Sequence, residues 1–527
     1  MSILVFYLNA ITASIFNISK KANPFNNSFD LDQHALRLRK KLKSNSSKKV
    51  KTKRIILVEA NQIPSNQLAL AMALPAFSKF FNANLVAYRV GAESSIQKAK
   101  QILRHKLSII SAAGATKILI LKKEKHSSMR DEFYKFGVCS KEDLENFTLD
   151  GVYLGDLIYD EYLSSTHSST INFEDLKFQQ IFQDSIKYVR LWEKIFENNK
   201  VSAICIWHDV YFYALPARVA FKYNVAAFSI TTRGVYRLTP EWPHAGLNPA
   251  NEVLQDAILP SNPSPQEDFA ETFGQSTLSH IYKSELALPS SSLKQKRSNK
   301  IRILVANHIF FDAPHCYGNM FYPDFEAWLT KLAVIAEETD YVWFLKPHPH
   351  APFWKENNLI ELFSENNRMF RLLPIEISKE EIEKLSIDFV LTVHGTTSLH
   401  YATEGYKVIN ASRNNPYNKY GFSYTPDSRE QYERILRDLE NFDYDFKFGE
   451  VVNYAENIAK LEIENWLFKS HNDYFDQFKT ANEAMSTQSY SYFLKFDNSR
   501  KSTEIENALI NFLNSEHLNL NRIHFKN

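Results

Sequence analysis

Short runs of apolar and β-branched residues alternate along this chain with longer segments in which apolar residues recur every three or four positions. The runs are typical of buried strands, and the longer spacing is typical of helices that cover a sheet. In order, the predicted strands are residues 54–61, 84–90, 117–123, 201–207, 226–230, 300–307, 341–345, 370–373, 388–393 and 407–410. Strands separated by helices predict parallel sheets with right-handed crossovers. We therefore expect an α/β protein with two Rossmann-like domains that face each other across a cleft.

The pattern between and after these strands sets the expected domain boundaries. Helices are predicted at 67–81, 95–113, 173–198, 211–223, 324–338, 353–366, 378–386, 428–441, 452–468, 470–486 and 502–515. Residues 240–300 are rich in Pro, Ser, Asn and Gln, which is typical of a connection between domains. In chain order we predict a basic and partly disordered arm (1–53), a first α/β domain (54–260), a linker (261–299), a second α/β domain (300–490) and a C-terminal helix (491–527).

Composition excludes several classes of protein. Hydrophobic residues make up 44% of the chain and aromatic residues 14%, which is enough for packed cores and excludes wholesale disorder. The three cysteines are widely spaced, which favours a reducing compartment over a disulfide framework or a structural zinc site. No strand is followed by GxGxxG, and GxxxxGK[ST], HExxH and GxSxG are absent. We therefore expect no cofactor, no metal site, no P-loop and no hydrolase elbow.

Charge is distributed unevenly along the chain. Residues 1–54 carry a net charge of +10 and the remainder −8. An apolar stretch at 3–18 precedes the basic cluster, but it is shorter than the roughly 20 residues that a spanning helix needs. An apolar segment beside a basic cluster can hold a protein on anionic lipid, whereas a solvated arm is the simpler alternative. We expect a cytoplasmic protein, peripheral to the inner face of the membrane if the arm binds lipid, with no nucleic-acid partner.

The sequence KPHPH follows the strand at 341–345 and is the most specific candidate site. Lys346 offers a point charge and His348 a directional donor, both suited to a phosphate-bearing ligand. Pro349 helps to limit the freedom of this loop. His308 follows another strand of the same predicted sheet. Because ligands bind beyond the carboxyl ends of parallel strands, we expect these side chains to share one edge, although a rigid turn with an exposed lysine is the simpler interpretation.

A second candidate loop follows the strand at 388–393. The turn from His394 to Ser398, which includes Gly395 and Thr397, leads into a segment with helical character. The first turn of a helix has unpaired N–H groups and binds anions, and its hydroxyl residues either bond a phosphate or simply cap the helix. Glu404, further along, is a candidate for a ribose hydroxyl or an ordinary surface acid.

Candidate acids and bases come from the first domain. His208 and Asp209 follow a predicted strand, so they should face the second domain. A carboxylate at that position can act as a general base or as a nucleophile. Asp156 lies four residues before Asp160, and both share a face if that segment is helical. Each of these acids alternatively caps a helix or pairs with a basic group. We expect Asp209, Asp156 and His208 to include the catalytic residues.

Together these features resemble a known family. Two successive α/β domains, KPHP in the second, and an Asp-apolar-Thr turn with hydroxyl residues and a downstream Glu are similar to the GT-B glycosyltransferases of bacterial surface polysaccharides. The capsule polysaccharide Kdo transferases and the CDP-glycerol glycerophosphotransferases are the most similar groups, over about residues 300–412. In them the His-Pro motif and the Ser/Thr turn bind the donor's phosphates; the matching positions are His348, Pro349, Thr397 and Ser398. The resemblance implies a metal-independent enzyme with no cofactor besides its nucleotide-sugar co-substrate.

The resemblance leads to four function hypotheses. We expect a glycosyltransferase that moves a sugar from a nucleotide-activated, preferably cytidine-linked donor to a capsule or lipopolysaccharide chain. The second domain is expected to bind the nucleotide and the first to bind a glycan or lipid-linked glycan acceptor. The alternatives are a polyol-phosphate transferase of the CDP-glycerol type, a sugar-nucleotide epimerase, and a non-catalytic membrane assembly protein.

Overall fold

The structure is a computed structural model of the chain. It describes most of two α/β domains and several helices outside them. The residues described are 33–45, 51–60, 63–90, 94–121, 135–245, 300–349, 357–395, 397–415, 418, 420–447, 449–451, 466–468, 486–496 and 499–520. The predicted linker, His350 and most of the predicted helices at 452–468 and 470–486 lie outside these residues.

The first domain is built on a six-stranded sheet with the order β3-β2-β1-β6-β7-β8. All neighbouring strands are parallel except β7 and β8, which are antiparallel. The strands are β1 (Arg54–Glu59), β2 (Asn84–Val90), β3 (Lys117–Leu121), β6 (Lys200–Ile206), β7 (Ala226–Ile230) and β8 (Val235–Leu238). A separate two-stranded ribbon joins β4 (Thr148–Leu149) to β5 (Val152–Tyr153).

Helices cover both faces of this sheet, which explains why its strands read as continuous apolar runs. Leu57 and Ile204 pack in the layer of α9 and α10, whereas Ile56 and Val58 pack in the layer of α3 and α5. The helices of the domain are α3 (Pro64–Phe81), α4 (Ser95–Leu107), α5 (Ile109–Ala112), α7 (Lys141–Glu145), α8 (Gly155–Thr166), α9 (Leu176–Asn198) and α10 (Leu215–Lys222). A short 3-10 turn, η2 (Tyr211–Tyr213), precedes α10.

The second domain repeats this architecture with a six-stranded, fully parallel sheet of order β11-β10-β9-β12-β13-β14. Its strands are β9 (Arg302–Ala306), β10 (Val342–Lys346), β11 (Phe370–Leu372), β12 (Phe389–Thr392), β13 (Lys407–Asn410) and β14 (Ser423–Tyr424). The helical elements are η3 (Pro314–Tyr317), α14 (Phe325–Glu338), α16 (Asn357–Asn366), α17 (Lys379–Lys384), α18 (Thr397–Thr403) and α19 (Arg429–Arg437). The predicted fold class, two Rossmann-like parallel-sheet domains, is confirmed.

The strand orders locate the edge at which each sheet can bind a ligand. In both sheets the chain first runs outward to one side and then returns to continue on the other side. The change of direction lies between β1 and β6 in the first sheet and between β9 and β12 in the second. Ligands of doubly wound sheets bind beyond the carboxyl ends of the strands at such a switch point.

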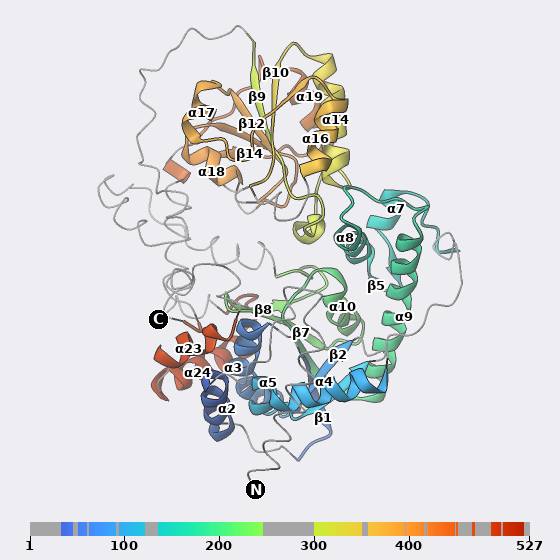
Figure 1. Cartoon of the computed structure of the whole chain (residues 1–527), viewed down its shortest axis with the longest axis vertical. Coiled ribbons are helices and arrows are strands. Elements are labelled where there is room, and N and C mark those ends of the chain that lie inside the picture. The colour runs from blue at the N-terminus through green and yellow to red at the C-terminus, as the bar shows by residue number, and fades with distance from the viewer. Residues whose placement is uncertain are drawn as a thin grey trace.

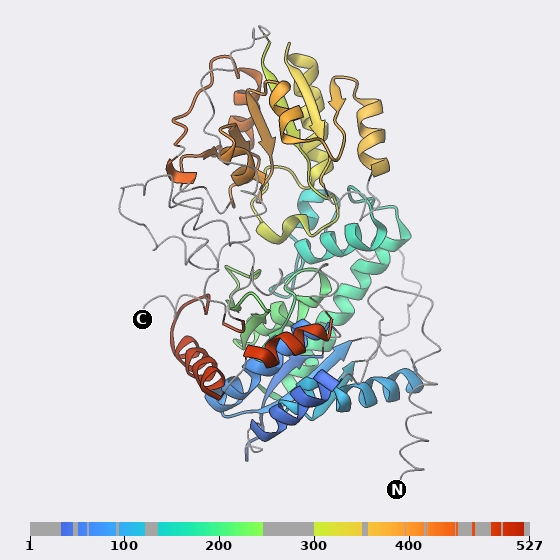
Figure 2. The ribbon, with the colours of Figure 1, turned by 60° about the vertical axis from the view of Figure 1, so that its left-hand side comes forward.

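The two ends of the chain belong to the first domain. In the predicted basic arm, α2 (Gln33–Asn45) is a helix that buries Leu38 and Leu42 against the first domain. The helices α23 (Gln488–Phe496) and α24 (Ser499–Asn514) return from the second domain and pack beside α2 and α3 (Figure 1, Figure 2). This differs from the predicted boundaries, which assign residues up to 490 to the second domain. Among the residues described, no helix combines the length and the apolar character needed to cross a membrane.

The domains meet at α7, α8 and the segment after α8, which lie against η3 and the start of α14 (Figure 1). One apolar cluster is continuous across this contact and includes Ile158 of α8 and Phe311 and Phe325 of the second domain. Polar groups accompany it, and His167 stacks on Phe311 with ring centroids 4.7 Å apart. Tyr211, which follows β6 of the first sheet, also contacts the loop after β9, since its hydroxyl lies 3.5 Å from the carboxylate of Asp312.

Candidate functional site

Imidazoles gather at the switch point of the second sheet. His308 follows β9, and its Nε2 lies 2.9 Å from the hydroxyl of Thr392 at the end of β12. The rings of His308 and His394 have centroids 5.0 Å apart. His348, from the loop after β10, lies close enough for its charge to lower the pKa of His308, in addition to the larger effect of burial. The structure therefore brings His308, His348 and His394 together from three neighbouring strands.

Backbone partners fix the protonation of two of these rings. The N–H of Val393 donates to Nε2 of His308 at 3.2 Å, and because an N–H group can only donate, that nitrogen is an acceptor. Burial lowers the pKa of His308 well below its usual value, so the ring is neutral and carries its proton on Nδ1. In His394, Nε2 donates to the carbonyl of Pro314 at 3.3 Å. Burial lowers the pKa of His394 to about 4, and its proton therefore lies on Nε2.

Lys346 supplies the positive charge of this edge. It is the last residue of β10, and burial alone lowers its pKa, with no carboxylate among the described residues to oppose that effect. Burial, and to a lesser extent the charge of Lys346, lowers the pKa of His400 in α18, so Lys346 lies near the helix that follows the His394 turn. The next residues are the buried Pro347 and the exposed Pro349. A partly desolvated cation without a carboxylate is a suitable partner for an anionic ligand.

The turn after β12 and the helix α18 contain the second group of candidate residues. Gly395 has a φ of +88° with open space around the position of a Cβ, and α18 begins at Thr397, inside the segment predicted as a turn. Ser398, however, is completely buried, and its hydroxyl donates to Oδ1 of Asn410 at 2.5 Å. This hydroxyl thus joins α18 to β13, and the role of Ser398 as a phosphate ligand stays a prediction. Glu404 follows α18 and lies 4.0 Å from the ammonium of Lys379, and burial raises its pKa.

His208 and Asp209 lie where the first sheet meets the second domain. They follow β6, and burial lowers the pKa of His208 while the charges of Asp209 and Asp312 act in the opposite direction. Asp312 belongs to the loop after β9, and the hydroxyl of Tyr211 donates to it at 3.5 Å. The carboxylate of Asp209 accepts a hydrogen bond from the backbone N–H of Ala245. Both predicted residues are thus near the second domain, as their position after a strand indicates.

Asp156 lies in a buried environment beside two basic side chains. It lies at the start of α8, is 3% exposed, and its Oδ2 is 2.5 Å from the Arg218 guanidinium and 2.8 Å from Nε2 of His244. Burial opposes ionisation, but Arg218 and His244 outweigh it and hold the pKa of Asp156 well below its usual value. Its carboxylate thus forms a buried ion pair inside the first domain, and its catalytic role stays a prediction.

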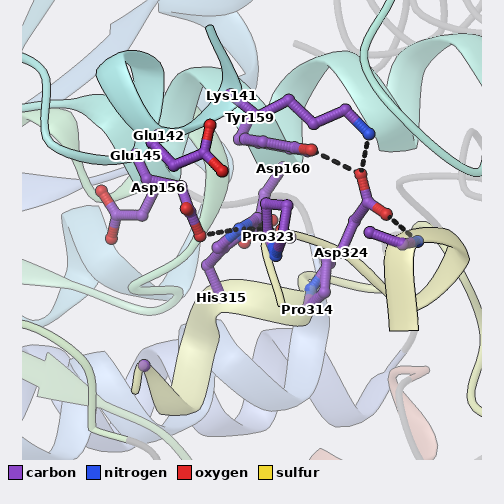
Figure 3. Close-up of polar contacts among 12 residues, drawn as sticks. Lys141, Glu142, Glu145, Asp156, Tyr159, Asp160, Pro314, His315, Pro323 and Asp324 are labelled. Carbon is purple, nitrogen blue, oxygen red and sulfur yellow. Dashed lines mark hydrogen bonds and ion pairs between the residues drawn. The ribbon is translucent and has the colours of Figure 1, made fainter. Parts of the chain in front are cut away.

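Polar residues at the domain contact are drawn in Figure 3. Nδ1 of His315 in η3 is 2.5 Å from Oδ1 of Asp160 in α8. Beside it, one carboxylate oxygen of Asp324 accepts from Lys141 at 3.0 Å and from the hydroxyls of Tyr159 and Thr170 at 2.5 Å each. Sequence reasoning did not select His315 or Asp324, because isolated polar residues between apolar ones carry no signal of a partner more than a hundred positions away.

Glu59 is a further residue that sequence reasoning missed. It ends β1 at the switch point of the first sheet and is 8% exposed. Its carboxylate accepts from the indole of Trp207 at 2.8 Å and from the backbone N–H of the same residue at 3.2 Å. Burial, which outweighs these hydrogen bonds, raises the pKa of Glu59 to about 8. Glu59 is the last residue of the first strand, and this position is the sequence feature from which it could have been predicted.

An apolar depression of about 310 Å³ lies next to the imidazole cluster but does not include it. Its lining residues come from the β11 side of β10: Pro347, Ile360, Glu361, Leu372, Leu373, Pro374 and Ile375. No group of three or more potential metal ligands occurs among the described residues. The charged and imidazole side chains at the switch point are therefore the stronger candidate site.

Comparison with known proteins returns solved structures alone, since no family model and no curated protein matches the sequence. The chain is similar to the beta Kdo 2,7 transferase of Thermosulfurimonas dismutans KpsC, with 14% identity, coverage of 50% of this chain and 79% of that chain, and a TM-score of 0.30. It is also similar to the UDP-GlcNAc 2-epimerase of Methanocaldococcus jannaschii (13% identity, 77% and 99% coverage, TM-score 0.25). For Acinetobacter baumannii MurG the values are 10% identity, 78% and 99% coverage and a TM-score of 0.23. At these identities and TM-scores the likeness assigns neither a family nor a reaction.

Proposed function

We propose that this chain is a glycosyltransferase that binds a nucleotide-activated sugar on its second domain. The observation that carries the proposal is the grouping of Lys346 with His308, His348 and His394 at the switch point of the second sheet. A phosphate group is the ligand that best suits a desolvated ammonium beside imidazole donors. In such a reaction the departing nucleotide gains negative charge, and preorganised positive groups stabilise that charge in the transition state.

Each side chain has a distinct part in the proposed reaction. Lys346 opposes the charge of the leaving phosphate, and Nδ1–H of His308 is a directional donor to one of its oxygens. Asp209 is the first-domain carboxylate next to the second-domain loop, and it would act as base on the acceptor or as nucleophile towards the sugar carbon. No step in this scheme requires a metal ion. By the family resemblance we propose a cytidine-linked donor and a glycan or lipid-linked glycan acceptor of a surface polysaccharide.

The basic N-terminal segment would supply the membrane association of such an enzyme. We propose that residues 1–54, with a net charge of +10, hold the protein peripherally at the cytoplasmic face of the membrane, where lipid-linked acceptors are available. The exposed basic residues of α2, Arg37, Lys40 and Lys43, are suitable groups for anionic lipid. Vesicle flotation with and without anionic lipid tests this part, and equal binding to neutral vesicles would contradict it.

The experiment that tests the proposed function is a transfer assay with CMP-, CDP-, UDP- and GDP-linked sugars. His348→Ala should reduce turnover by at least about 100-fold if it stabilises the leaving phosphate, while circular dichroism remains unchanged. Lys407→Met is a matched control, because Lys407 lies at the start of β13, on the opposite edge of the sheet, and pairs with Asp443. Full activity of His348→Ala would contradict the proposal.

A further inference from the structure

His315 contacts both domains. It directly follows Pro314, whose carbonyl contacts His394 of the imidazole cluster. Its Nδ1 lies 2.5 Å from the carboxylate of Asp160 in the first domain, and its Nε2 lies 2.9 Å from the carbonyl of Pro323 in the second. When Asp160 is ionised, its carboxylate and the Pro323 carbonyl only accept hydrogen bonds, so both ring nitrogens donate. His315 is then an imidazolium cation, and the Asp160 and Glu145 carboxylates raise its pKa well above the usual value. The two side chains, 7% and 1% exposed, form a buried ion pair between domains.

The peptide group that precedes His315 holds a member of the imidazole cluster. The carbonyl of Pro314 accepts the hydrogen bond from Nε2 of His394, and this carbonyl belongs to the peptide bond between Pro314 and His315. The direction of the Pro314 carbonyl is therefore set by the backbone of His315. The ring of His315 is itself held by hydrogen bonds at both nitrogens. A continuous series of contacts leads from Asp160 through His315 and the Pro314 carbonyl to the ring of His394.

We propose that Asp160 of the first domain is a positioning residue for the nucleotide phosphate site of the second domain, acting through His315 and the Pro314 carbonyl on His394. The inference rests on the proposed function, because it takes the imidazole cluster to be that site. It adds that the nucleotide site is complete only when the first domain is in place. Donor binding is therefore coupled to the domain contact near which the acceptor would bind.

Charged groups around His315 determine the pH range over which this contact persists. Asp160 and Tyr159 face it from α8, Glu145 faces it from α7 at 3.6 Å, and His394 faces it from the turn after β12. Burial lowers the pKa of His315, but the Asp160 and Glu145 carboxylates outweigh burial and raise it well above the usual value. Because the folded-state pKa of His315 is raised, the pair is lost as the pH rises through that pKa. Burial raises the pKa of Asp160 above its usual value, so the pair is also lost at acid pH, when Asp160 takes up a proton.

The same interface offers a matched control. The hydroxyl of Tyr159 donates to Asp324 across the domain contact at 2.5 Å, and its ring lies on His315 with centroids 4.5 Å apart. Tyr159→Phe removes one hydrogen bond between the domains but keeps the ring and leaves the Asp160–His315 pair unchanged. Asp160→Asn keeps the volume of the side chain but removes the charge that keeps His315 protonated. The two variants separate positioning of His394 from a general weakening of the interface.

The test measures the affinity of the full chain for CMP, CDP, UDP, GDP and ADP by calorimetry, and the ¹⁵N resonances of its histidines without ligand. For the nucleotide that binds most tightly, we expect Asp160→Asn to raise Kd by about tenfold, within the usual range of coupling between sites, and to shift the Nε2 resonance of His394. Tyr159→Phe should leave Kd within about twofold and that resonance unchanged. In the wild type, the His394 resonance should also move when His315 loses its proton at alkaline pH, a measurement that needs no variant.

Three results have distinct meanings. Equal losses of affinity in Asp160→Asn and Tyr159→Phe would overturn the inference, because both would then only hold the domains together. Wild-type affinity in Asp160→Asn with an unshifted His394 resonance would overturn it as well and leave the proposed function standing. If no nucleotide binds to the wild type, the proposed function fails, while the ligand-free resonances still decide whether Asp160 controls His394.

Discussion

Neighbouring histidines in the candidate site have opposite tautomers. His308 accepts at Nε2 from a backbone N–H and His394 donates from Nε2 to a backbone carbonyl, although their rings are only 5.0 Å apart. The sequence selects both residues because each follows a strand. It cannot say which nitrogen carries the proton, because the backbone partners come from positions 85 and 80 residues away.

Lys346 permits a sharp prediction. Replacing it by Met should weaken nucleotide binding by about 1.5–3 kcal/mol, the usual contribution of a hydrogen bond to a charged group. Lys346→Arg should recover only part of that loss, because a fork of donors replaces a point charge. Calorimetry at two salt concentrations measures both effects. Unaltered binding by Lys346→Met would exclude this lysine from the phosphate site.

Glu59 should make stability depend on pH. Its pKa is about 8 in the folded protein, against an ordinary value of 4.5, so between these values the folded chain holds a proton that the unfolded chain has released. Stability of the first domain therefore falls as the pH rises through this window, by at most about 1.4 kcal/mol per pH unit. Glu59→Gln should remove this slope in urea unfolding followed between pH 5 and 8. An unchanged slope would show that the carboxyl does not titrate abnormally.

At the level of elements, hydrophobic runs predicted the strands well because both faces of each sheet are covered by helices. Local capping signals also agree with the structure: Ser94 with Gln97 and Ser378 with Glu381 form capping boxes at α4 and α17. The expected helix at 211–223 begins later, since Tyr211 has a φ of +54° and Pro216 occupies the first turn of α10.

Elements that depend on distant contacts were not predictable in the same way. Strand β8 pairs with β7 in the antiparallel sense, and no periodicity distinguishes that direction. The basic segment at α2 appeared solvated because its charges hide the two apolar residues, Leu38 and Leu42, that anchor it. The hydrogen bond from Ser398 to Asn410 was likewise not predictable, because the two residues come from different elements.

Arg237 of β8 should be essential for the attachment of α24. Its guanidinium donates to the carbonyls of Phe512, Leu513 and Ser515 at the end of that helix, where unpaired carbonyls concentrate negative charge. Arg237→Ala should lower the stability of the first domain by about 2 kcal/mol. The control is Arg233→Ala, because Arg233 is exposed. Equal melting temperatures for both variants would contradict this role.

For the whole molecule, the first domain is discontinuous in sequence, whereas all strands of the second sheet lie within residues 302–424. Deleting residues 486–527 should consequently destabilise the first domain and leave the second domain's unfolding transition in place, because α23 and α24 contribute buried side chains to one core only. Differential scanning calorimetry would resolve the two transitions. Loss of the second domain's transition would contradict the assignment of these helices to the first.

The proposed transferase rests on two sheets joined by a buried polar contact and on one lysine with three imidazoles at the edge of the second sheet. The most direct measurement is thermal unfolding of the purified chain with CMP, CDP, UDP, GDP and ADP, each against inorganic phosphate. We expect at least one nucleotide, preferably a cytidine nucleotide, to stabilise the protein by about 2.7 kcal/mol at a hundredfold excess over Kd, and His348→Ala to remove that stabilisation. No stabilisation by any nucleotide, or equal stabilisation of His348→Ala, would contradict the nucleotide site on which the account depends.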